Sequence, residues 1–261
     1  MERILTARFL LAMTALWFIG SPLRAQTFTL LSGWPEPNAQ VHAMALDEMN
    51  GLLYIGGDFT EVSGQPRERL AAIDIATGTL TAWAPTANLA VRAIVARGDS
   101  VIIGGSFTEV NGEPRLRLAA FDRTTAALSP WAPSATSNVH CLLADATTLY
   151  VGGIFTMVAG EPRGMLAAFD ANGDLTDWNP NGNAHVYDMR FNGTHILAAG
   201  NFTSLGGASR AYFGELDAST GLATTWTANA DNTGCLLYTS LVQLDQARGH
   251  IELGIAGHVF L

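Results

Sequence analysis

The stretch that decides the fold begins at Leu53 and reads LYIGGDFTEVSGQPRERLAAIDIATGTLTAWAP. It returns from Val101 as VIIGGSFTEVNGEPRLRLAAFDRTTAALSPWAP, from Leu149 as LYVGGIFTMVAGEPRGMLAAFDANGDLTDWNP, and more loosely from Ile196 as ILAAGNFTSLGGASRAYFGELDASTGLATTWTA. The anchors that recur in every copy are Phe59, Phe107, Phe155 and Phe202; Arg67, Arg115, Arg163 and Arg210; Asp74, Asp122, Asp170 and Asp217; Trp83, Trp131, Trp178 and Trp226. A period of about 48 residues is typical of a solenoid, an array or a propeller.

Each copy contains four short apolar runs separated by turn residues. In the second copy these runs are Val91–Ala96, Ser100–Gly104, Leu116–Asp122 and Ala127–Trp131. Runs of this length, rich in Val, Ile, Leu and Phe and bounded by Gly, Asn, Asp and Pro, predict strands. A helical repeat of similar length is the rival, but double glycines such as Gly56-Gly57 fall inside the apolar runs and would weaken a helix. Four strands per repeat predict an all-β propeller blade.

The expected β-propeller spans residues 26–233 and contains four recognisable blades, as part of a larger ring. The blades are predicted at about residues 41–83, 91–131, 139–178 and 186–226. Residues 27–34 resemble a fourth strand, so we expect them to complete the last blade and remove its exposed edge. Between the second and third strands a longer loop is expected, and the glycines at Gly64, Gly112, Gly160 and Gly207 allow its reversal.

Two kinds of anchor have predicted structural roles. Trp83, Trp131, Trp178 and Trp226 end the fourth strands, and each is large enough to wedge between adjacent blades. The arginines Arg67, Arg115, Arg163 and Arg210 are expected to bridge their loop to the neighbouring blade through an aspartate or backbone carbonyls. Because both kinds recur in every copy, a structural role is favoured over a ligand role.

The units GGDFTEVSGQPRERLAAID and GGSFTEVNGEPRLRLAAFD resemble the delta-60 type β-propeller repeats of secreted bacterial proteins. The double glycine followed by Phe-Asp and a Trp is also similar to kelch units, and the hairpin from Ala72 to Trp83 resembles the tryptophan-docking hairpin of quinoprotein propellers. The resemblance covers residues 28–232. It implies an extracellular scaffold or binding module, and no residue of a quinoprotein cofactor site is carried over.

The first 25 residues have the pattern of a secretory signal peptide. Arginines flank the start, an apolar run extends from Phe9 to Gly20, and small residues precede a cleavage site after Ala25. The alternative, an uncleaved membrane anchor, is disfavoured because a dozen apolar residues are too few to span a bilayer. No later segment is long and apolar enough to cross a membrane, so the mature chain is expected to be secreted, either extracellular, periplasmic or at the cell surface.

The composition limits the partners. The chain has 14 Lys and Arg against 23 Asp and Glu, a net charge of −9, and every basic residue is arginine. Clustered positive charge is needed to bind nucleic acid or anionic lipid, so those partners are excluded. An extracellular protein or a glycan is the expected partner.

One end of each blade carries the loop between its second and third strands. Residues at that end that differ between the copies are the candidate ligand-binding residues. The first set lies at the entrance of the first strand: His42, Arg92, His140 and Tyr187. The second follows the double glycine: Asp58, Ser106, Ile154 and Asn201. The third lies further along the loop: Glu61, Glu109, Met157 and Ser204. Loops on a rigid scaffold commonly carry function, although solvated loop residues would give the same pattern.

Two function classes remain open. One is a non-catalytic extracellular module that binds a protein, glycan or surface component. The other is a propeller enzyme, a glycan lyase or hydrolase, whose acids lie among Asp58, Glu61 and Glu109, because a glycosidase needs two carboxylates facing one cleft. No nucleophile elbow, phosphate-binding loop or metal-ligand spacing occurs, so no catalytic residue, cofactor or metal is assigned and binding is favoured.

Residues 234–261 break the repeat register. After Trp226 the pattern should continue with another first strand, whereas the chain reads GCLLYTSLVQLDQARGHIELGIAGHVFL. The tail is either a diverged half-blade or a foreign, chimeric segment, and we expect it to be poorly integrated.

Overall fold

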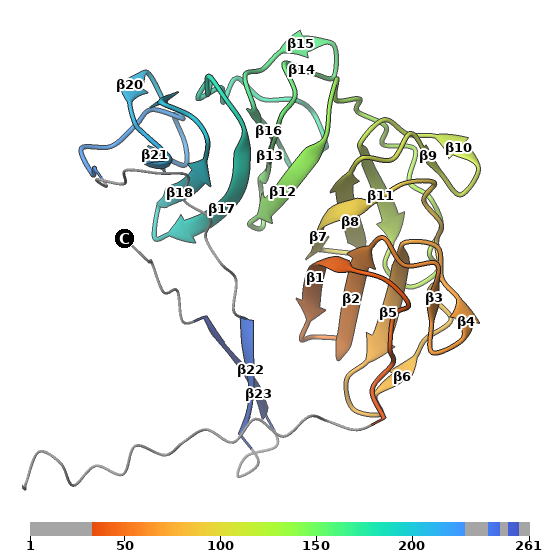
Figure 1. Cartoon of the computed structure of the whole chain (residues 1–261). Helices are drawn as coiled ribbons and strands as arrows, with labels where there is room; N and C mark the ends of the chain where they lie inside the picture. Colours follow the sequence, from red (N-terminus) through yellow and green to blue (C-terminus); the bar gives the residue numbers. More distant parts are fainter. Residues whose placement is uncertain (1–32, 228–239, 246–249, 256–261) are drawn as a thin grey trace, which may run out of the picture. The chain divides into compact units, whose positions relative to one another are not determined.

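Four antiparallel sheets follow one another along the chain, each built from one copy of the repeat (Figure 1). The computed structural model describes residues 33–227, 240–245 and 250–255. The blade strands are β1 (Val41–Asp47), β2 (Leu52–Gly57), β5 (Leu70–Asp74) and β6 (Thr79–Leu80); β7 (Val91–Arg97), β8 (Ser100–Gly105) and β11 (Leu118–Asp122); β12 (Val139–Ala144), β13 (Leu149–Gly153) and β16 (Leu166–Phe169); and β17 (Val186–Asn192), β18 (His195–Gly200) and β21 (Phe213–Asp217). The described residues form strands and turns without a helix, so the all-β prediction is confirmed.

The first strands are neighbours in the order of the chain. β1 contacts β7, β7 contacts β12, and β12 contacts β17, so each blade packs face to face on the next (Figure 1). Within a blade the order runs from first to second to third strand, as in β12-β13-β16. This is the arrangement of propeller blades, and it places equivalent residues of successive first strands beside one another.

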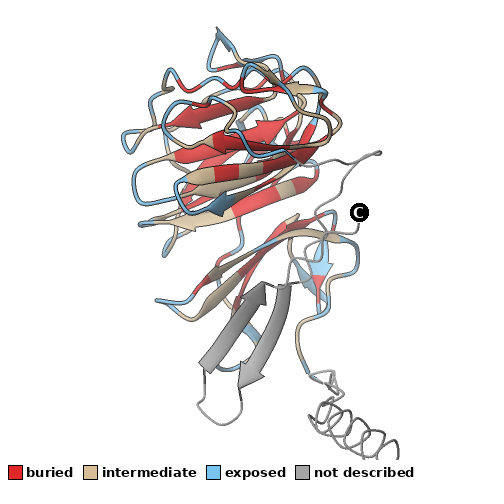
Figure 2. Cartoon of the chain, turned by 90° about the vertical axis from the view of Figure 1, so that its left-hand side faces the viewer, coloured by how far each residue is buried: buried red, intermediate tan, exposed pale blue. Residues whose placement is uncertain are grey.

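The hydrophobic core lies between the blades. One buried cluster joins Tyr54 and Trp83 of the first blade to Val91, Ile103 and Phe121 of the second, and two further clusters join the later pairs. Figure 2 shows the buried residues along the strands and the exposed ones in the loops. Both faces of a middle blade are therefore covered, which explains why its strands lack a clean polar alternation.

The tryptophans are buried only where the structure describes a following blade. The indole Nε1 of Trp83 donates to the Asp122 carbonyl, that of Trp131 to the Gly173 carbonyl and that of Trp178 to the Asp217 carbonyl, each in the next blade. Trp83 and Trp178 are 5% exposed and Trp131 is partly buried. The prediction that Trp226 is buried is wrong: its side chain is 42% exposed, because no described blade follows it.

The recurrent arginines tie their own blade together, which corrects the predicted bridge to the neighbour. Each guanidinium donates to a backbone carbonyl of the fourth strand or its equivalent in the same repeat. The pairs are Arg67 with Thr81, Arg115 with Ser129, Arg163 with Thr176 and Arg210 with Thr224. Backbone carbonyls were among the expected acceptors, but they were expected in the neighbouring blade.

The loop between the second and third blade strands is itself a small hairpin. These hairpins are β3 (Glu61–Val62) with β4 (Gln65–Pro66), β9 (Glu109–Val110) with β10 (Glu113–Pro114), β14 (Met157–Val158) with β15 (Glu161–Pro162), and β19 (Ser204–Leu205) with β20 (Ala208–Ser209). Two residues with positive φ make each turn, as in Ser63 (50°) and Gly64 (74°). Such type I′ pairs match the twist of the flanking strands, so the predicted role of the glycines is confirmed.

The fourth strand is shorter than expected. Only the first blade keeps it as β6, and in the second blade the predicted strand Ala127–Trp131 is reduced to a bridge between Phe121 and Leu128. Pro130 has no N–H to continue the pairing.

Some predictions fall on residues outside the description. The predicted signal peptide (1–25) lies wholly outside the described residues, and so does the predicted closing strand (27–34) except for its last two residues. In the tail, β22 (Ser240–Asp245) and β23 (His250–Ile255) form a two-stranded sheet of their own, and its relation to the repeats stays a prediction. No helix in the described part of the chain has the length and apolarity to cross a membrane.

Candidate binding site

The four residues predicted at the entrance of the first strands all lie at a β-bulge. The pairing of first with second strand shifts register between Val41 and Ala43, and the same shift recurs at the equivalent place in the other blades. The residues at the shift are His42, Arg92, His140 and Tyr187, here called the bulge row. A bulge turns a side chain away from the alternation of the strand, and the adjacency of β1, β7, β12 and β17 sets these four side by side.

The second glycine of each pair brings the following residue to the bulge row. A Cβ added at Gly57 would lie 2.1 Å from the Gln40 carbonyl oxygen, and one at Gly105 would lie 2.2 Å from that of Ala90. Only glycine allows this approach, and the next N–H then donates to the same carbonyl, as Asp58 does to Gln40 at 2.8 Å. The side chain after the double glycine is thereby held against the bulge.

Side-chain hydrogen bonds join the first two predicted sets into pairs. His42 Nε2 lies 2.7 Å from Asp58 Oδ2, and Arg92 Nε donates to Ser106 Oγ at 3.0 Å. In the fourth blade, Asn201 Nδ2 donates to Tyr187 Oη at 2.7 Å.

The third blade departs from this pairing. Its residue after the double glycine is Ile154, which offers His140 no polar partner. The His140 ring instead packs edge-on against Tyr187, with ring centroids 5.7 Å apart. Three different polar pairs and one aromatic contact therefore occupy one repeated position.

The third predicted set does not join the bulge row. Glu61 and Glu109 stand on the β3–β4 and β9–β10 hairpins, which Figure 1 shows on the side of their blades away from β1 and β7. Both residues are exposed, and neither carboxylate has a hydrogen bond or ion pair with the described residues. Their backbones are held instead: the N–H of Glu61 donates to Asn38 Oδ1 and that of Glu109 to Asn88 Oδ1. Met157 and Ser204 occupy the equivalent hairpin positions.

The structure adds three residues that the sequence reasoning missed. His185 Nδ1 lies 3.3 Å from Tyr187 Oη. Arg69 and Arg117, both with φ near 70°, donate from Nη1 to the carbonyls of Asp58 and Ser106 respectively. The signal that could have found the two arginines is variation within the repeat, because Met165 and Tyr212 stand at the equivalent positions with the same positive φ.

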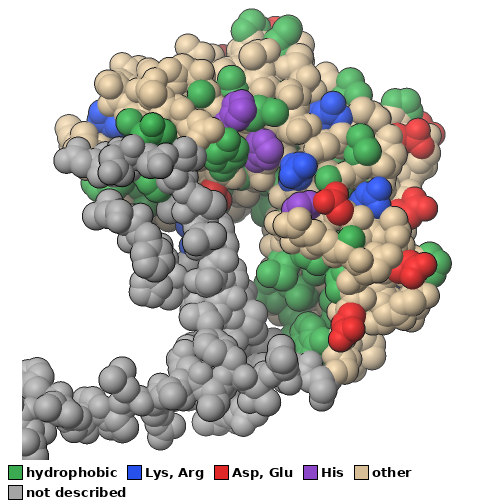
Figure 3. Space-filling model, viewed as in Figure 1, with side chains coloured by type: hydrophobic (Ala, Val, Ile, Leu, Met, Phe, Trp, Pro, Cys, Tyr) green, Lys and Arg blue, Asp and Glu red, His purple; other side chains and the backbone are tan. Residues whose placement is uncertain are grey.

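Positive charge gathers at this end of the blades. Figure 3 shows arginine and histidine side chains close together on one face, with acidic side chains mostly toward its margin. The pKa of His140 is lowered from 6.5 to about 4, mainly by burial and further by the nearby Arg92 and His185. Burial and these two neighbours therefore both disfavour a positive charge on the His140 ring.

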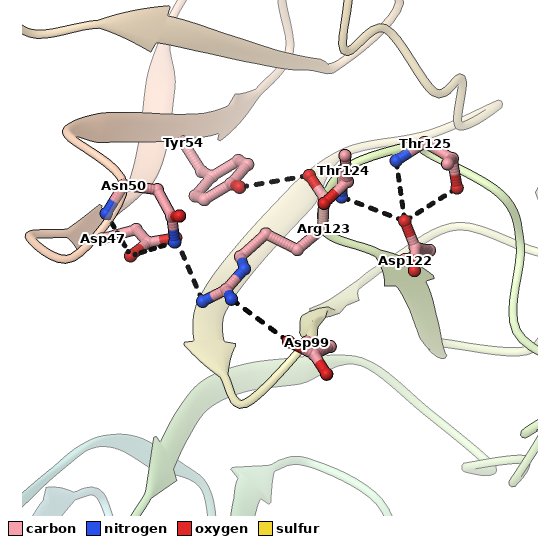
Figure 4. Close-up of polar contacts among 8 residues, drawn as sticks. All are labelled: Asp47, Asn50, Tyr54, Asp99, Asp122, Arg123, Thr124 and Thr125. Carbon is pink, nitrogen blue, oxygen red and sulfur yellow. Dashed lines mark hydrogen bonds and ion pairs between the residues drawn. The ribbon is translucent and has the colours of Figure 1, made fainter.

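The opposite end of the first two blades holds a different polar group. Arg123 lies 3.4 Å from Asp47 Oδ2 and 3.2 Å from Asp99 Oδ1, at the edge of a hollow of about 610 Å³ (Figure 4). Asp47 is buried, Asn50 donates to the same carboxylate, and Tyr54 Oη donates to the Arg123 carbonyl. Because two carboxylates already occupy the guanidinium, this group joins two blades rather than offering a free cation.

Metal binding finds no ready site. Within residues 33–227 and the described parts of the tail, no three His, Cys, Asp or Glu side chains are grouped so that they could hold a metal ion.

Comparison with known proteins identifies the fold but no family. No family model matches the chain, and no curated protein matches it. Among solved structures, the WD40 repeats of RRP9 are similar with a TM-score of 0.50 at 9% identity, covering 71% of this chain and 48% of that one. The computationally designed Ika4 protein gives a TM-score of 0.42 at 14% identity, covering 62% of this chain and 86% of that one. This chain thus spans about half the length of the RRP9 propeller and shares its β-propeller fold.

Proposed function

We propose that this chain is a secreted, non-catalytic β-propeller of the delta-60 or kelch-like kind that binds an extracellular ligand through the bulge row. The repeat wording GGDFTEVSGQPR and the leader pattern of residues 1–25 support the family and the location. Secretion has a direct test: N-terminal sequencing of the exported protein should begin at Gln26. A mature protein that still begins at Met1 would contradict it.

One observation carries the binding proposal. The anchor Phe, Arg, Asp and Trp residues recur in each copy, whereas the bulge row presents His, Arg, His and Tyr from one repeated position. Each of these side chains is oriented by a neighbour, as Asp58 orients His42 and Ser106 orients Arg92. Identical scaffolds with differing, oriented side chains at one end are what an asymmetric ligand requires.

The experiment uses a panel of immobilised neutral and acidic oligosaccharides probed with the labelled full chain. Wild type is compared with a triple variant, Arg92→Ala, His140→Ala and Tyr187→Ala. We expect the variant to lose the binding that wild type shows while its melting temperature stays within about 3 °C. A variant that binds the same oligosaccharides equally well would remove the bulge row from the proposal.

The same panel distinguishes binding from catalysis. The enzyme alternative needs two carboxylates across one cleft, and Glu61 and Glu109 are exposed on separate hairpins while Asp58 is paired with His42. Release of new reducing ends, abolished by Glu61→Gln or Glu109→Gln with stability intact, would replace the binding module with a glycan lyase or hydrolase.

A further inference from the structure

The charge at the bulge row is opposite to that of the chain. The whole chain carries a net charge of −9. Three guanidinium groups and one carboxylate lie at the bulge row or on the residues bonded to it. The guanidinium groups belong to Arg69, Arg92 and Arg117, and the carboxylate is that of Asp58, so the local net charge is +2 while the histidines are neutral. A local reversal of this kind marks a place suited to an anion.

The guanidinium of Arg92 has the free donors that an anion needs. Its Nε is used on Ser106, and its two terminal nitrogens form no hydrogen bond with the described residues. Arg92 is half-buried in the middle of the row, between His42 on one neighbouring strand and His140 on the other. A carboxylate can accept both terminal N–H groups at once, which gives direction as well as attraction.

Neutral polar groups lie beside this guanidinium and further along the row. Ser106 offers a hydroxyl, and the Tyr187 hydroxyl and the Asn201 amide follow two blades further on. The Tyr187 and His140 rings, packed edge to face, add ring surface to the row. Hydroxyl, amide and ring surfaces are the groups that recognise a sugar, because they pair with its hydroxyls and pack on its C–H face.

We propose that the bulge row binds a short acidic oligosaccharide, with a uronate carboxylate on Arg92 and neighbouring sugar hydroxyls on Tyr187, Asn201 and Ser106. This inference rests on the proposed function and names its ligand class. A short ligand is specified because the exposed carboxylates of Glu61 and Glu109 stand on hairpins further out on the same blades and would repel a long polyanion that extended over them.

The titratable groups at the row predict that binding of this ligand depends on pH. The titratable and charged groups at the site are Arg92 from β7, His140 from β12, Tyr187 from β17 with His185 just before it, His42 from β1, and Asp58, Arg69 and Arg117 from the loops. Asp188, the next residue of β17, lies near Cys141 instead. Burial is the main cause of the His140 pKa of about 4, and the charges of Arg92 and His185 add to it. A bound carboxylate beside the ring would favour its charged form, so His140 would gain a proton on binding as the pH falls.

The test measures the affinity of the full chain for trigalacturonate by calorimetry, beside its fully methyl-esterified form, which has the same sugars without charge. We expect trigalacturonate to bind, and we expect the affinity of the ester to be lower by about tenfold or more. Lowering the pH from 7.5 to 5 should strengthen binding on the order of tenfold in wild type and much less in His140→Gln.

Variants locate the site. Arg92→Gln should weaken binding about tenfold or more, because it removes the charge-assisted pair. The matched control is Arg97→Gln, which removes an arginine from the other end of the same strand and should leave affinity unchanged.

Each other outcome has one meaning. Equal binding of acid and ester, still lost in the Arg92 variant, would overturn the uronate inference and keep the binding module. Binding of an acetylated tripeptide acid, but not of its amide or of trigalacturonate, would replace the saccharide with a peptide carboxylate. If trigalacturonate does not bind, the inference is wrong; if the row variants change no binding to any oligosaccharide, the proposed function itself fails.

Discussion

Two positions recur in every blade: the tryptophan junction, where Trp83, Trp131, Trp178 and Trp226 stand, and the bulge row. The junction has the same residue in all four copies, whereas the bulge row has different ones. At the junctions the residue is always Trp, and three of the four indoles donate to the backbone of the next blade. At the bulge row the backbone geometry repeats while the side chain changes from His42 to Arg92, His140 and Tyr187. Uniform residues thus hold blades together, and differing residues at a uniform backbone position are free to serve recognition.

The largest effect is expected at a tryptophan junction. Trp83→Ala should lower the free energy of unfolding by about 3–5 kcal/mol, because the ring fills the space between Tyr54 and Phe121. Trp226→Ala is the matched control and should cost less than about 1 kcal/mol, since Trp226 is 42% exposed. Denaturant unfolding measures both, and equal losses would mean that the indole acts within its own repeat.

A somewhat smaller effect is expected where the bulge meets the double glycine. Gly105→Ala should cost about 3 kcal/mol, because its Cβ would lie 2.2 Å from the Ala90 carbonyl oxygen and the strands must separate. Gly112→Ala, at a turn with φ of 79° and open space around it, should cost about 1 kcal/mol. Denaturation curves compare the two.

The same glycine variant also connects stability to the site. Loss of the close approach should displace Ser106 from Arg92, so Gly105→Ala protein that remains folded should bind more weakly than Gly112→Ala protein. Equal stability of the two variants would contradict the packing argument.

The sequence was sufficient to predict the blade architecture, because the residues that recur in every copy could be recognised as structural. Four copies of one pattern predicted the blades, the hairpin glycines and the location of His42 and Asp58 at the same end, but not their hydrogen bond. Exposure of Trp226 could not be predicted from its own repeat, since burial depends on what packs beyond it. The place of Glu61 on a separate hairpin depends on a two-residue turn that sends the loop outward, and a longer undivided loop was expected instead.

The positive charge of the site was hidden by its distribution along the chain. Arg69 and Arg117 are 48 positions apart and sit between scaffold residues, so neither forms a basic run. The propeller brings their guanidinium groups to the carbonyls of Asp58 and Ser106. Each contact forms within one blade, and the packing of β1 on β7 then sets the two blades beside each other.

The smallest expected effect is on the pH dependence of stability, and it arises from His140 of the bulge row. The folded-state pKa of His140 is about 4, below its ordinary 6.5, so the unfolded chain binds the proton more readily. Stability should therefore fall as the pH drops from about 6.5 to 4, by about 1 kcal/mol after allowance for solvent screening of a partly exposed ring.

Comparison with His140→Gln isolates this slope. Asp188, whose pKa is raised to about 7 by burial, contributes stability that is present at low pH and lost as the pH rises toward 7, and it does so equally in both proteins. The urea midpoint of each protein is measured at pH 7 and at pH 4.5. The midpoint of wild type relative to that of His140→Gln should be lower at pH 4.5 than at pH 7, because only wild type carries His140. A difference that is independent of pH would contradict the assigned environment of the ring.

The central claim is that the bulge row is the binding surface, and histidine NMR tests it most directly. Ring resonances of the full chain are recorded during titration with trigalacturonate. We expect the signals of His42, His140 and His185 to shift together, while that of His195, at the far end of β18, stays in place. Measurable binding in which His195 shifts, or in which none of these other three histidines responds, would contradict the account.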